Sequence, residues 1–266
     1  MAAPSEPFRP LGTFSFVFPM WNEEAIVERT IAAACEAGDR LVAEGEVASY
    51  EIVVVDDAST DATGGILDRL ALELPLLRVV HHSTNRKLGG SLKTAFAEAR
   101  GDFVVYSDAD LPFDLFEVVK AMRLLRIHQA DVVSAYRFHR TGEGPRRAVY
   151  SYVYNTMIRM LYGIQIRDVN FAFKLMRRQV LDKVELRSEG SFIDVELLCR
   201  ARAAGFSTIQ FGVDYFPRSR GESTLSSPAV IVKIVRELLA LHADLRAAPQ
   251  AVAAPQPEPS EPEVTA

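Results

Sequence analysis

The feature of this sequence that most constrains the fold is an apolar run, Phe103–Tyr106, that ends abruptly in the acids Asp108 and Asp110. β-branched and aromatic residues in such a run predict a buried parallel strand, and open α/β sheets bind ligands at the carboxyl ends of strands. Two carboxylates there suit Mg²⁺ or Mn²⁺, which accept one or two protein carboxylates while phosphates fill other positions. A solvated loop with two acids would give the same pattern, so the surrounding segments must decide.

Similar runs alternate with helical segments along the chain, which predicts one α/β domain with a mostly parallel central sheet flanked by helices. With 266 residues, 48% of them hydrophobic, the chain can bury a sizeable core. The other expected strands are 14–18, 51–55, 77–80, 132–135, 208–213 and one within 167–175. The expected helices end near residues 44, 74, 100, 128, 162, 184, 204 and 241.

Composition sets the expected boundaries and environment. We expect a flexible arm at 1–12, the folded domain at 13–246 and a disordered tail at 247–266, where Ala, Pro and Glu repeat without aromatic residues. The net charge of −5 gives no general attraction to nucleic acid. Cys35 and Cys199 lie in helical segments and predict buried thiols. The sequence shows no leader and no apolar run of ~18 residues, which predicts a cytoplasmic protein that is neither exported nor membrane-spanning.

The first expected strand runs into a turn, residues 19–24, that contains no glycine. A dinucleotide-binding domain would place G-x-G-x-x-G at this turn so that the backbone could approach a pyrophosphate, so the sequence argues against that class. Asn22 as a helix cap, with Glu23 and Glu24 in the first helical turn, is the simplest explanation of the polar residues.

The second expected strand ends in Asp56 and Asp57, and Asp61 follows. Adjacent carboxylates repel each other unless hydrogen-bond donors meet them, and ribose hydroxyls or base N–H groups could be those donors. Ser59 or Thr60 is expected to cap the helix that follows.

The third expected strand leads to His81, His82 and a basic turn that contains Lys87 and Gly89. A basic, glycine-containing helix entry suits a phosphate or diphosphate, and a plain solvated turn accounts for it equally well. The Walker A pattern is absent, which excludes a P-loop. The two histidines lack a third ligand at metal spacing, so we expect them to be structural.

Two arginine-rich loops stand out in an otherwise acidic chain. Arginine binds phosphate through two N–H groups, so these loops are candidate anion sites, with a solvated loop as the alternative. The arginines are Arg137, Arg140, Arg146 and Arg147 in the first loop and Arg218 and Arg220 in the second. Between them, Asp194 and Glu196 lie two apart on an expected helix, so they point to different faces and only one is expected to face a site.

Taken together, these motifs resemble family 2 glycosyltransferases of the GT-A type over about residues 14–225. The order of the motifs carries the resemblance: Pro-x-x-Asn-Glu-Glu after the first strand, Asp-Asp-x-Ser-x-Asp after the second, Leu-Gly-Gly-Ser before a helix, and then Asp-Ala-Asp. Arg-Asp before Phe-Lys-Leu, then Asp-Val-Glu-Leu-Leu and Gly-Glu-Ser-Thr-Leu, resemble the transferases that make dolichyl- or polyprenyl-phosphate hexoses, of the mannose and glucose types.

The resemblance implies a GDP- or UDP-linked sugar as donor and a polyprenyl or dolichyl phosphate as acceptor. Asp108 and Asp110 would hold the Mg²⁺ or Mn²⁺ that bridges the donor diphosphate. The donor would be surrounded by Pro19, Trp21, Glu23, Asp56, Asp57, Asp61, Lys87 and Gly89.

The sequence also departs from the family pattern. Pro112 stands where relatives often carry a polar residue that can add a metal contact. Trp21 stands where Tyr is common, and residues 170–172 replace a glycine-containing stretch, which bears on the fit of the sugar or the acceptor.

The implied reaction is an inverting transfer, in which the acceptor attacks the anomeric carbon in line as the nucleoside diphosphate leaves. Asp110 would hold the metal that stabilises the leaving group. A phosphate acceptor is already an anion and needs no general base, whereas a hydroxyl acceptor needs a carboxylate base, for which Asp194 is the candidate. The candidate cations for an acceptor phosphate are Arg137, Arg146, Arg147, Arg218 and Arg220.

Two apolar segments, 147–162 and 231–241, suggest where a lipid acceptor would lie. They are predicted either to form a surface where an isoprenoid chain and the bilayer interface meet, or to pack on the core or in a homo-oligomer. The first option implies peripheral contact with the inner face of the membrane.

Other functions remain open at this point. The main alternative is a soluble family 2 transferase with a sugar, small-molecule or protein hydroxyl as acceptor. A sugar-phosphate nucleotidyltransferase would show a glycine-rich basic turn at residues 19–24, and a haloacid-dehalogenase phosphatase would carry Thr or Val in place of Pro112. A non-catalytic module would bind nucleotide sugar and metal without turnover.

Overall fold

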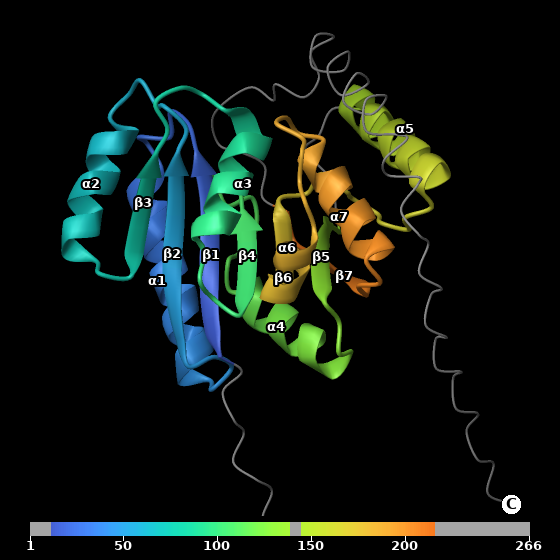
Figure 1. Cartoon of the computed structure of the whole chain (residues 1–266), viewed down its shortest axis with the longest axis horizontal. Coiled ribbons are helices and arrows are strands. Elements are labelled where there is room, and N and C mark those ends of the chain that lie inside the picture. Colours follow the sequence, from blue (N-terminus) through green and yellow to red (C-terminus); the bar gives the residue numbers. More distant parts are fainter. Residues whose placement is uncertain (1–11, 139–144, 216–266) are drawn as a thin grey trace, which may run out of the picture.

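The structure, a computed structural model, describes residues 12–138 and 145–215 (Figure 1). The strands are β1 (Thr13–Met20), β2 (Ser49–Asp56), β3 (Leu77–His81), β4 (Phe103–Ser107), β5 (Val132–Arg137), β6 (Phe173–Arg177) and β7 (Thr208–Val213). The helices are α1 (Val27–Ala43), α2 (Thr63–Glu73), α3 (Lys87–Glu98), α4 (Glu117–Ile127), α5 (Pro145–Tyr162), α6 (Arg178–Lys183) and α7 (Ile193–Ala203).

All of these strands belong to one sheet, in the order β3-β2-β1-β4-β6-β5-β7. β1 pairs in parallel with β2 and β4, β2 with β3, and β5 with β7. β6 lies between β4 and β5 and is antiparallel to both. The sheet is therefore mostly parallel, as predicted, with one antiparallel strand in its middle.

Alternation of side chains along the strands builds two separate hydrophobic cores. Phe14, Phe16 and Phe18 of β1 face one core, whereas Val17 faces the other. The same period of two continues in β4, where Phe103 and Val105 alternate with Val104 and Tyr106. Because both faces are apolar, the sheet must be covered on both sides.

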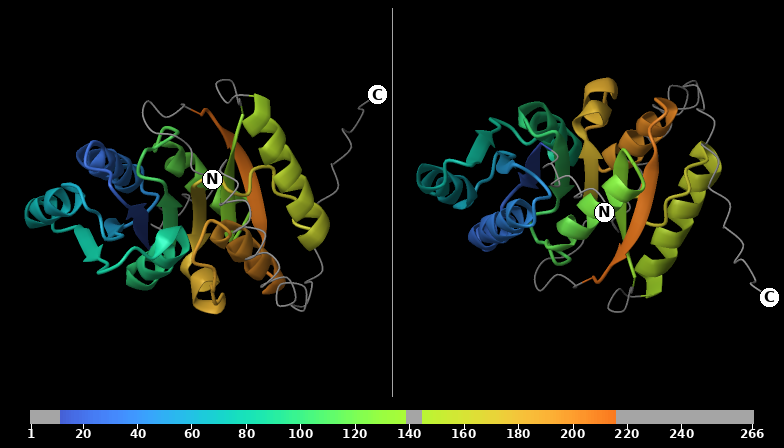
Figure 2. Two further views of the ribbon diagram at one scale, coloured as in Figure 1. Left: turned by 90° about the horizontal axis from the view of Figure 1, so that it is seen from above. Right: turned by 90° about the horizontal axis from the view of Figure 1, so that it is seen from below.

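Helices cover the two faces, as the views from above and below show (Figure 2). α1, α2 and α4 contribute to the first core, and α3, α5, α6 and α7 contribute to the second. The helix α1 shows how the sequence achieves this, because Val27, Ile31 and Ala34 recur at helical spacing and are all buried. The parallel strands and their crossover helices bring the loops after β1, β2, β3 and β4 to one edge of the sheet, which we call the carboxyl edge.

The helix starts differ from the sequence prediction. Asn22 does not cap α1, which begins at Val27 without a side-chain cap, and Ser59 and Thr60 do not cap α2, which begins at Thr63. α3 begins at Lys87, so the glycine-containing turn is part of the helix. The polar residues that resemble caps bind the neighbouring loop instead, as described below.

The predicted apolar segment at 147–162 forms α5, whose side chains are described from residue 152 onwards. Tyr152 and Met160 are 67% and 82% exposed, whereas Ile158 is buried against the second core. None of the helices in the described ranges is both long and apolar enough to cross a membrane. Cys35 and Cys199 are free thiols; Cys199 is buried, as predicted, whereas Cys35 is only half-buried. Residues 1–11, 139–144 and 216–266, with the predicted arm, tail and segment 231–241, lie outside the described residues.

Candidate active site

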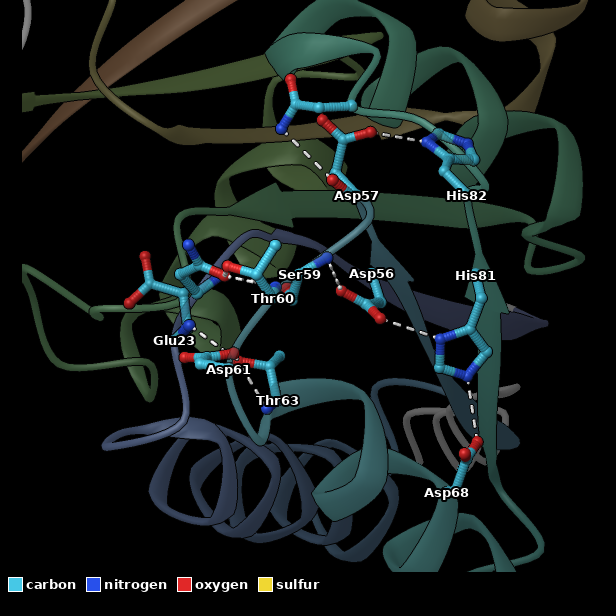
Figure 3. Close-up of polar contacts among 12 residues, drawn as sticks. Glu23, Asp56, Asp57, Ser59, Thr60, Asp61, Thr63, Asp68, His81 and His82 are labelled. Carbon is cyan, nitrogen blue, oxygen red and sulfur yellow. Dashed lines mark hydrogen bonds and ion pairs between the residues drawn. The ribbon is translucent and has the colours of Figure 1, made fainter.

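The loops after β1 and β2 interlock at the carboxyl edge (Figure 3). Strand register places Met20 opposite Asp56, so the two strands end side by side. The Asn22 amide oxygen accepts from the Thr60 N–H at 2.8 Å, and the Asn22 N–H donates to the Ser59 hydroxyl at 3.0 Å. Asn22 therefore joins two loops rather than starting a helix.

The next residues continue this contact. The Glu23 N–H donates to the Thr63 hydroxyl at 2.8 Å, and the Glu24 N–H donates to Asp61 Oδ2 at 3.1 Å. The other oxygen of Asp61 accepts from the Thr63 N–H at 3.0 Å. Burial raises the pKa of Asp61, but these hydrogen bonds outweigh burial and hold the pKa below its ordinary value. Asp61 is thus an ionised carboxylate that holds the two loops together.

The adjacent acids Asp56 and Asp57 receive their donors from the end of β3. Strand register places Asp56 opposite His81, and His81 Nδ1 lies 2.9 Å from Asp56 Oδ2 while its Nε2 lies 2.9 Å from Asp68 Oδ1 of α2. His82 Nδ1 lies 2.7 Å from Asp57 Oδ1 (Figure 3). Both histidines thus contact carboxylates of the protein and supply donors to Asp56 and Asp57 from within the chain.

The two carboxylates differ in what they leave for a ligand. Asp56 uses both oxygens, because Oδ1 accepts from the Ser59 N–H at 3.1 Å. Asp57 takes its two hydrogen bonds on Oδ1, from His82 and from the Arg86 N–H at 2.8 Å. Among the described residues, no donor reaches Asp57 Oδ2, so this oxygen can accept from a ribose hydroxyl or a base N–H.

The loop with the Asp-Ala-Asp motif follows β4 and lies against α1. The Thr30 hydroxyl donates to the Ala109 carbonyl at 2.5 Å, and the Leu111 N–H to the Asp108 carbonyl at 3.4 Å. This turn places Asp108 and Asp110, both half-buried residues, at the carboxyl edge, and the carboxylate oxygens of Asp110 are buried there. The described residues contain no group of three or more His, Cys, Asp or Glu that could hold a metal ion, so a metal here would take two carboxylates and complete its shell with ligand oxygens.

Left-handed backbone conformations concentrate in these loops. Asn22, Ala58, Lys87 and Leu111 have φ angles of 56°, 59°, 63° and 44°. Each of these residues lies in, or at the end of, the loop that follows one of the first four strands. In the described ranges only one other non-glycine residue, Gln129, has a positive φ. Such conformations cost on the order of 1 kcal/mol or more, and surrounding structure must enforce them. Strain of this kind is typical of binding loops.

The amino end of α3 packs on the turn at residues 187–190. The Gly89 N–H donates to the Glu189 carbonyl at 2.9 Å, and a Cβ on Gly89 would lie 2.4 Å from the Ser188 carbonyl oxygen. The absence of a side chain at Gly89 is therefore explained by packing, and its N–H already has a protein acceptor. The Lys87 side chain is exposed, so Lys87 rather than Gly89 remains the predicted contact for donor phosphate.

A buried polar cluster lies beneath the carboxyl edge, and Asp194 belongs to it. Lys174 Nζ, which has no solvent exposure, lies 2.7 Å from Asp194 Oδ1 and donates to the Phe171 carbonyl at 2.8 Å. The Tyr106 hydroxyl donates to the same Asp194 oxygen. Burial raises the pKa of Asp194 and lowers the pKa of Lys174 to about 7, against the opposing charges of Asp168 and Asp108. Asp194 is therefore enclosed rather than presented to an acceptor.

Glu196 lies on the same helix but faces other partners, as its spacing from Asp194 predicted. Its fully buried carboxylate accepts from the Ser188 N–H at 2.7 Å and the Arg187 N–H at 3.0 Å, and from Arg200 Nε at 2.8 Å. Burial raises the pKa of Glu196, but these hydrogen bonds hold it below its ordinary value. Glu196 thus fixes the turn on which α3 packs.

Arg137, the arginine at the end of β5, is paired with Asp168. Their side chains are 10% and 3% exposed, with Nε 2.7 Å from Oδ2 and Nη2 3.1 Å from Oδ1. The guanidinium also lies over the rings of Phe171 and Tyr215. Its role toward an acceptor phosphate stays a prediction. Arg140, Arg218 and Arg220, and the side chains of Arg146 and Arg147, lie outside the described residues.

The remaining predicted donor residues lie at the carboxyl edge. Pro19, the last residue but one of β1, is half-buried, Trp21 is 54% exposed, and Glu23 is half-buried. Pro112 is buried beside Leu111, so it contributes to packing. Sequence reasoning missed Lys174 as the partner of Asp194 and Asp168 as the partner of Arg137. The one signal for Lys174 was its position opposite Tyr106 across the strand pair, which only the register of β4 and β6 reveals.

Comparison with known proteins decides the family. The model of glycosyl transferase family 2 matches residues 15–185, more than half of the chain. The chain belongs to glycosyl transferase family 2. The matched range contains the loops of the carboxyl edge, including Asp57, Asp108 and Asp110, and ends before Asp194.

Individual relatives agree with this assignment. The chain is 32% identical to glycosyltransferase AglD of Haloferax volcanii, over 77% of this chain and 33% of that protein. It is 33% identical to polyprenol monophosphomannose synthase of Mycolicibacterium smegmatis, over 66% of this chain and 70% of that protein. The chain thus spans about a third of the length of the first relative and over two thirds of the second.

The solved structure of glucosyl-3-phosphoglycerate synthase from Mycobacterium tuberculosis, in complex with Mn²⁺, UDP and glucosyl-3-phosphoglycerate, shares the fold. The TM-score is 0.64 at 21% identity, over 90% of this chain and 81% of that one. The predicted GT-A fold is confirmed.

Proposed function

We propose that this family member is a metal-dependent, inverting hexosyltransferase that moves a hexose from a GDP- or UDP-linked sugar to a polyprenyl or dolichyl phosphate. The relative from M. smegmatis is a polyprenol monophosphomannose synthase, and the fold neighbour was crystallised with UDP and Mn²⁺. The described geometry supports a nucleoside diphosphate at the carboxyl edge, where Asp57 Oδ2 and the Asp108–Asp110 turn lie.

The enclosure of Asp194 is the observation that carries the acceptor assignment. A hydroxyl acceptor needs a carboxylate that can reach it and take its proton. Asp194 is 4% exposed and is held by Lys174 and Tyr106, which does not suit that role. A phosphate monoester is already ionised near neutral pH and needs no base. The enclosed carboxylate therefore favours an acceptor that arrives as an anion.

In this mechanism an oxygen of the acceptor phosphate forms a bond to the anomeric carbon as the bond from that carbon to the diphosphate oxygen breaks, which inverts the configuration. Asp108 and Asp110 offer the hard oxygen ligands that Mg²⁺ or Mn²⁺ prefers. When bound there, the metal supplies a Lewis acid for the departing diphosphate. The chain's own residues orient the donor, through Asp57 and the interlocked loops, and supply cations for the acceptor.

For the lipid, we propose that α5 contributes a contact with the membrane surface. Tyr152, Val153 and Met160 are exposed apolar side chains on this helix, and Arg159 is exposed beside them. Apolar residues with a neighbouring cation suit an interface with anionic lipid.

The test is transfer from labelled GDP-mannose and UDP-glucose, with Mg²⁺ or Mn²⁺, to polyprenyl phosphate in detergent, followed by extraction into organic solvent. Metal-dependent label in the organic phase is the expected result, and it also names the donor. Transfer of the sugar to an added hydroxyl compound, with no lipid product, would contradict the proposed acceptor. It would instead support the main alternative, a family 2 transferase with a hydroxyl acceptor.

A further inference from the structure

His82 lies in the second layer of the donor site and contacts two of its parts. Its Nδ1 is 2.7 Å from Asp57 Oδ1, and its Nε2 is 2.9 Å from the Thr94 hydroxyl on α3. The side chains of His82 and Asp57 are 6% and 5% exposed. An ionised carboxylate can only accept, so Nδ1 carries the proton in this contact.

The backbone around this pair is also fixed. The Asp57 N–H donates to the Met20 carbonyl at 2.8 Å, and the His82 N–H donates to the Asp56 carbonyl at 2.9 Å. The Arg86 N–H gives Asp57 Oδ1 a second donor at 2.8 Å, and the Asn85 side chain donates to the Asp57 carbonyl at 3.2 Å. Because both donors bind Oδ1, they fix the rotation of the Asp57 carboxylate, and Oδ2 faces away from His82.

We propose that His82 is a positioning residue of the donor site, which holds the Asp57 carboxylate so that Oδ2 is presented to the nucleoside of the donor. The proposal rests on the proposed function for the identity of the ligand, a nucleoside diphosphate. It goes further by assigning a residue that no motif of the family resemblance contains and by dividing the roles of two adjacent acids, because Asp56 uses both oxygens within the protein.

The link from His82 to Thr94 adds a second consequence. Thr94 lies on α3, the helix whose first residue is Lys87, the predicted phosphate contact. His82 therefore connects the nucleoside end of the site with the helix at its phosphate end. Loss of the imidazole ring should weaken binding of the whole nucleotide. The rate of the chemical step should change little, because His82 does not touch the reacting atoms.

Two substitutions separate this role from simple packing. In His82→Asn the amide nitrogen can occupy the place of Nδ1 and donate to Asp57, whereas His82→Leu fills space without a donor. The probes are GDP and UDP with Mn²⁺, titrated by calorimetry, together with kcat and KM for the donor sugar and the melting temperature. His128→Asn, at an exposed position after α4 near the opposite edge of the sheet, is the matched control.

We expect His82→Leu to weaken nucleotide binding and raise donor KM by about tenfold or more, as for loss of a hydrogen bond to a charged group, with kcat within about threefold. His82→Asn should stay within about threefold of the unmodified protein in both constants. Unchanged binding in His82→Leu, or equal losses in both variants that follow the melting temperature, would overturn the proposal.

The outcome for the proposed function is read separately. If the unmodified protein binds nucleotide but transfers sugar to a hydroxyl acceptor, the acceptor assignment fails, while the predicted difference between the two His82 variants still supports the positioning role. If it binds neither GDP nor UDP, both proposals are refuted.

Discussion

The acids at the carboxyl edge and the acids beneath it differ in what compensates their charge. At the edge, Asp57 is held by a backbone N–H group and a histidine, and Asp61 is held by backbone N–H groups. Beneath it, Asp168 and Asp194 are buried against Arg137 and Lys174. A carboxylate held by uncharged donors keeps its negative charge for a ligand, whereas a carboxylate paired with a buried cation has its charge neutralised within the protein.

The largest expected effect comes from the edge acid proposed to hold the metal. Asp110→Asn should lower sugar transfer by on the order of 10³-fold, because loss of a metal ligand removes several kcal/mol of stabilisation from the leaving group. The melting temperature should change little. Asp114→Asn is the matched control, because Asp114 is exposed and its Oδ1 accepts from the Phe116 N–H, which an amide oxygen can also do. Full activity in Asp110→Asn would refute the metal assignment.

A buried cation gives the next effect, on stability. Lys174→Met should lower the free energy of unfolding by about 3 kcal/mol, because it leaves Asp194 buried without its cation and the Phe171 carbonyl without the lysine donor. Chemical denaturation measures this loss. Lys120→Met, at an exposed lysine that pairs with Glu117, should cost less than about 1 kcal/mol. Equal losses in the two variants would show that the buried cluster is not coupled as described.

A smaller effect tests the strain at the edge. Ala58 has a φ of 59°, so Ala58→Gly should raise the free energy of unfolding by about 0.5–1 kcal/mol, less any gain in flexibility of the unfolded chain. Ala97→Gly, at an exposed position inside α3, should have the opposite sign and cost about 1 kcal/mol. A destabilised Ala58→Gly protein would contradict the assignment of strain to this loop.

The smallest expected effect is a pH dependence of protein stability that comes from His81 at the carboxyl edge. Burial lowers the pKa of His81, but Asp56 and Asp68 outweigh burial and raise it above its ordinary value. A raised folded-state pKa gives stability that is complete below the unfolded value of about 6.5 and is lost as pH rises through the folded value. His81→Gln should remove this part of the pH dependence in denaturation curves recorded across that window. An unchanged curve would show that His81 does not carry the charge assigned to it.

Much of the fold could be predicted because its signals are local. The apolar runs at 103–106 and 51–55 lie inside the observed β4 and β2, and the predicted mostly parallel sheet is confirmed. The partners of polar residues could not be predicted, because they depend on strand register and on contacts between loops. Asn22 resembles a helix cap in the sequence but binds Thr60, and Asp194 resembles an accessible base but lies against a lysine from β6.

The antiparallel strand β6 has a consequence for how the chain folds as it is synthesised. The strands β1 to β4 are neighbours that are complete by residue 107, so this part of the sheet can pair while later residues are still being made. β5 has only β6 and β7 as neighbours, and neither exists until residues 173–177 and 208–213 have emerged. The carboxyl ends of β1 to β4 can therefore come together on the ribosome first, while β5 stays unpaired along both of its sides.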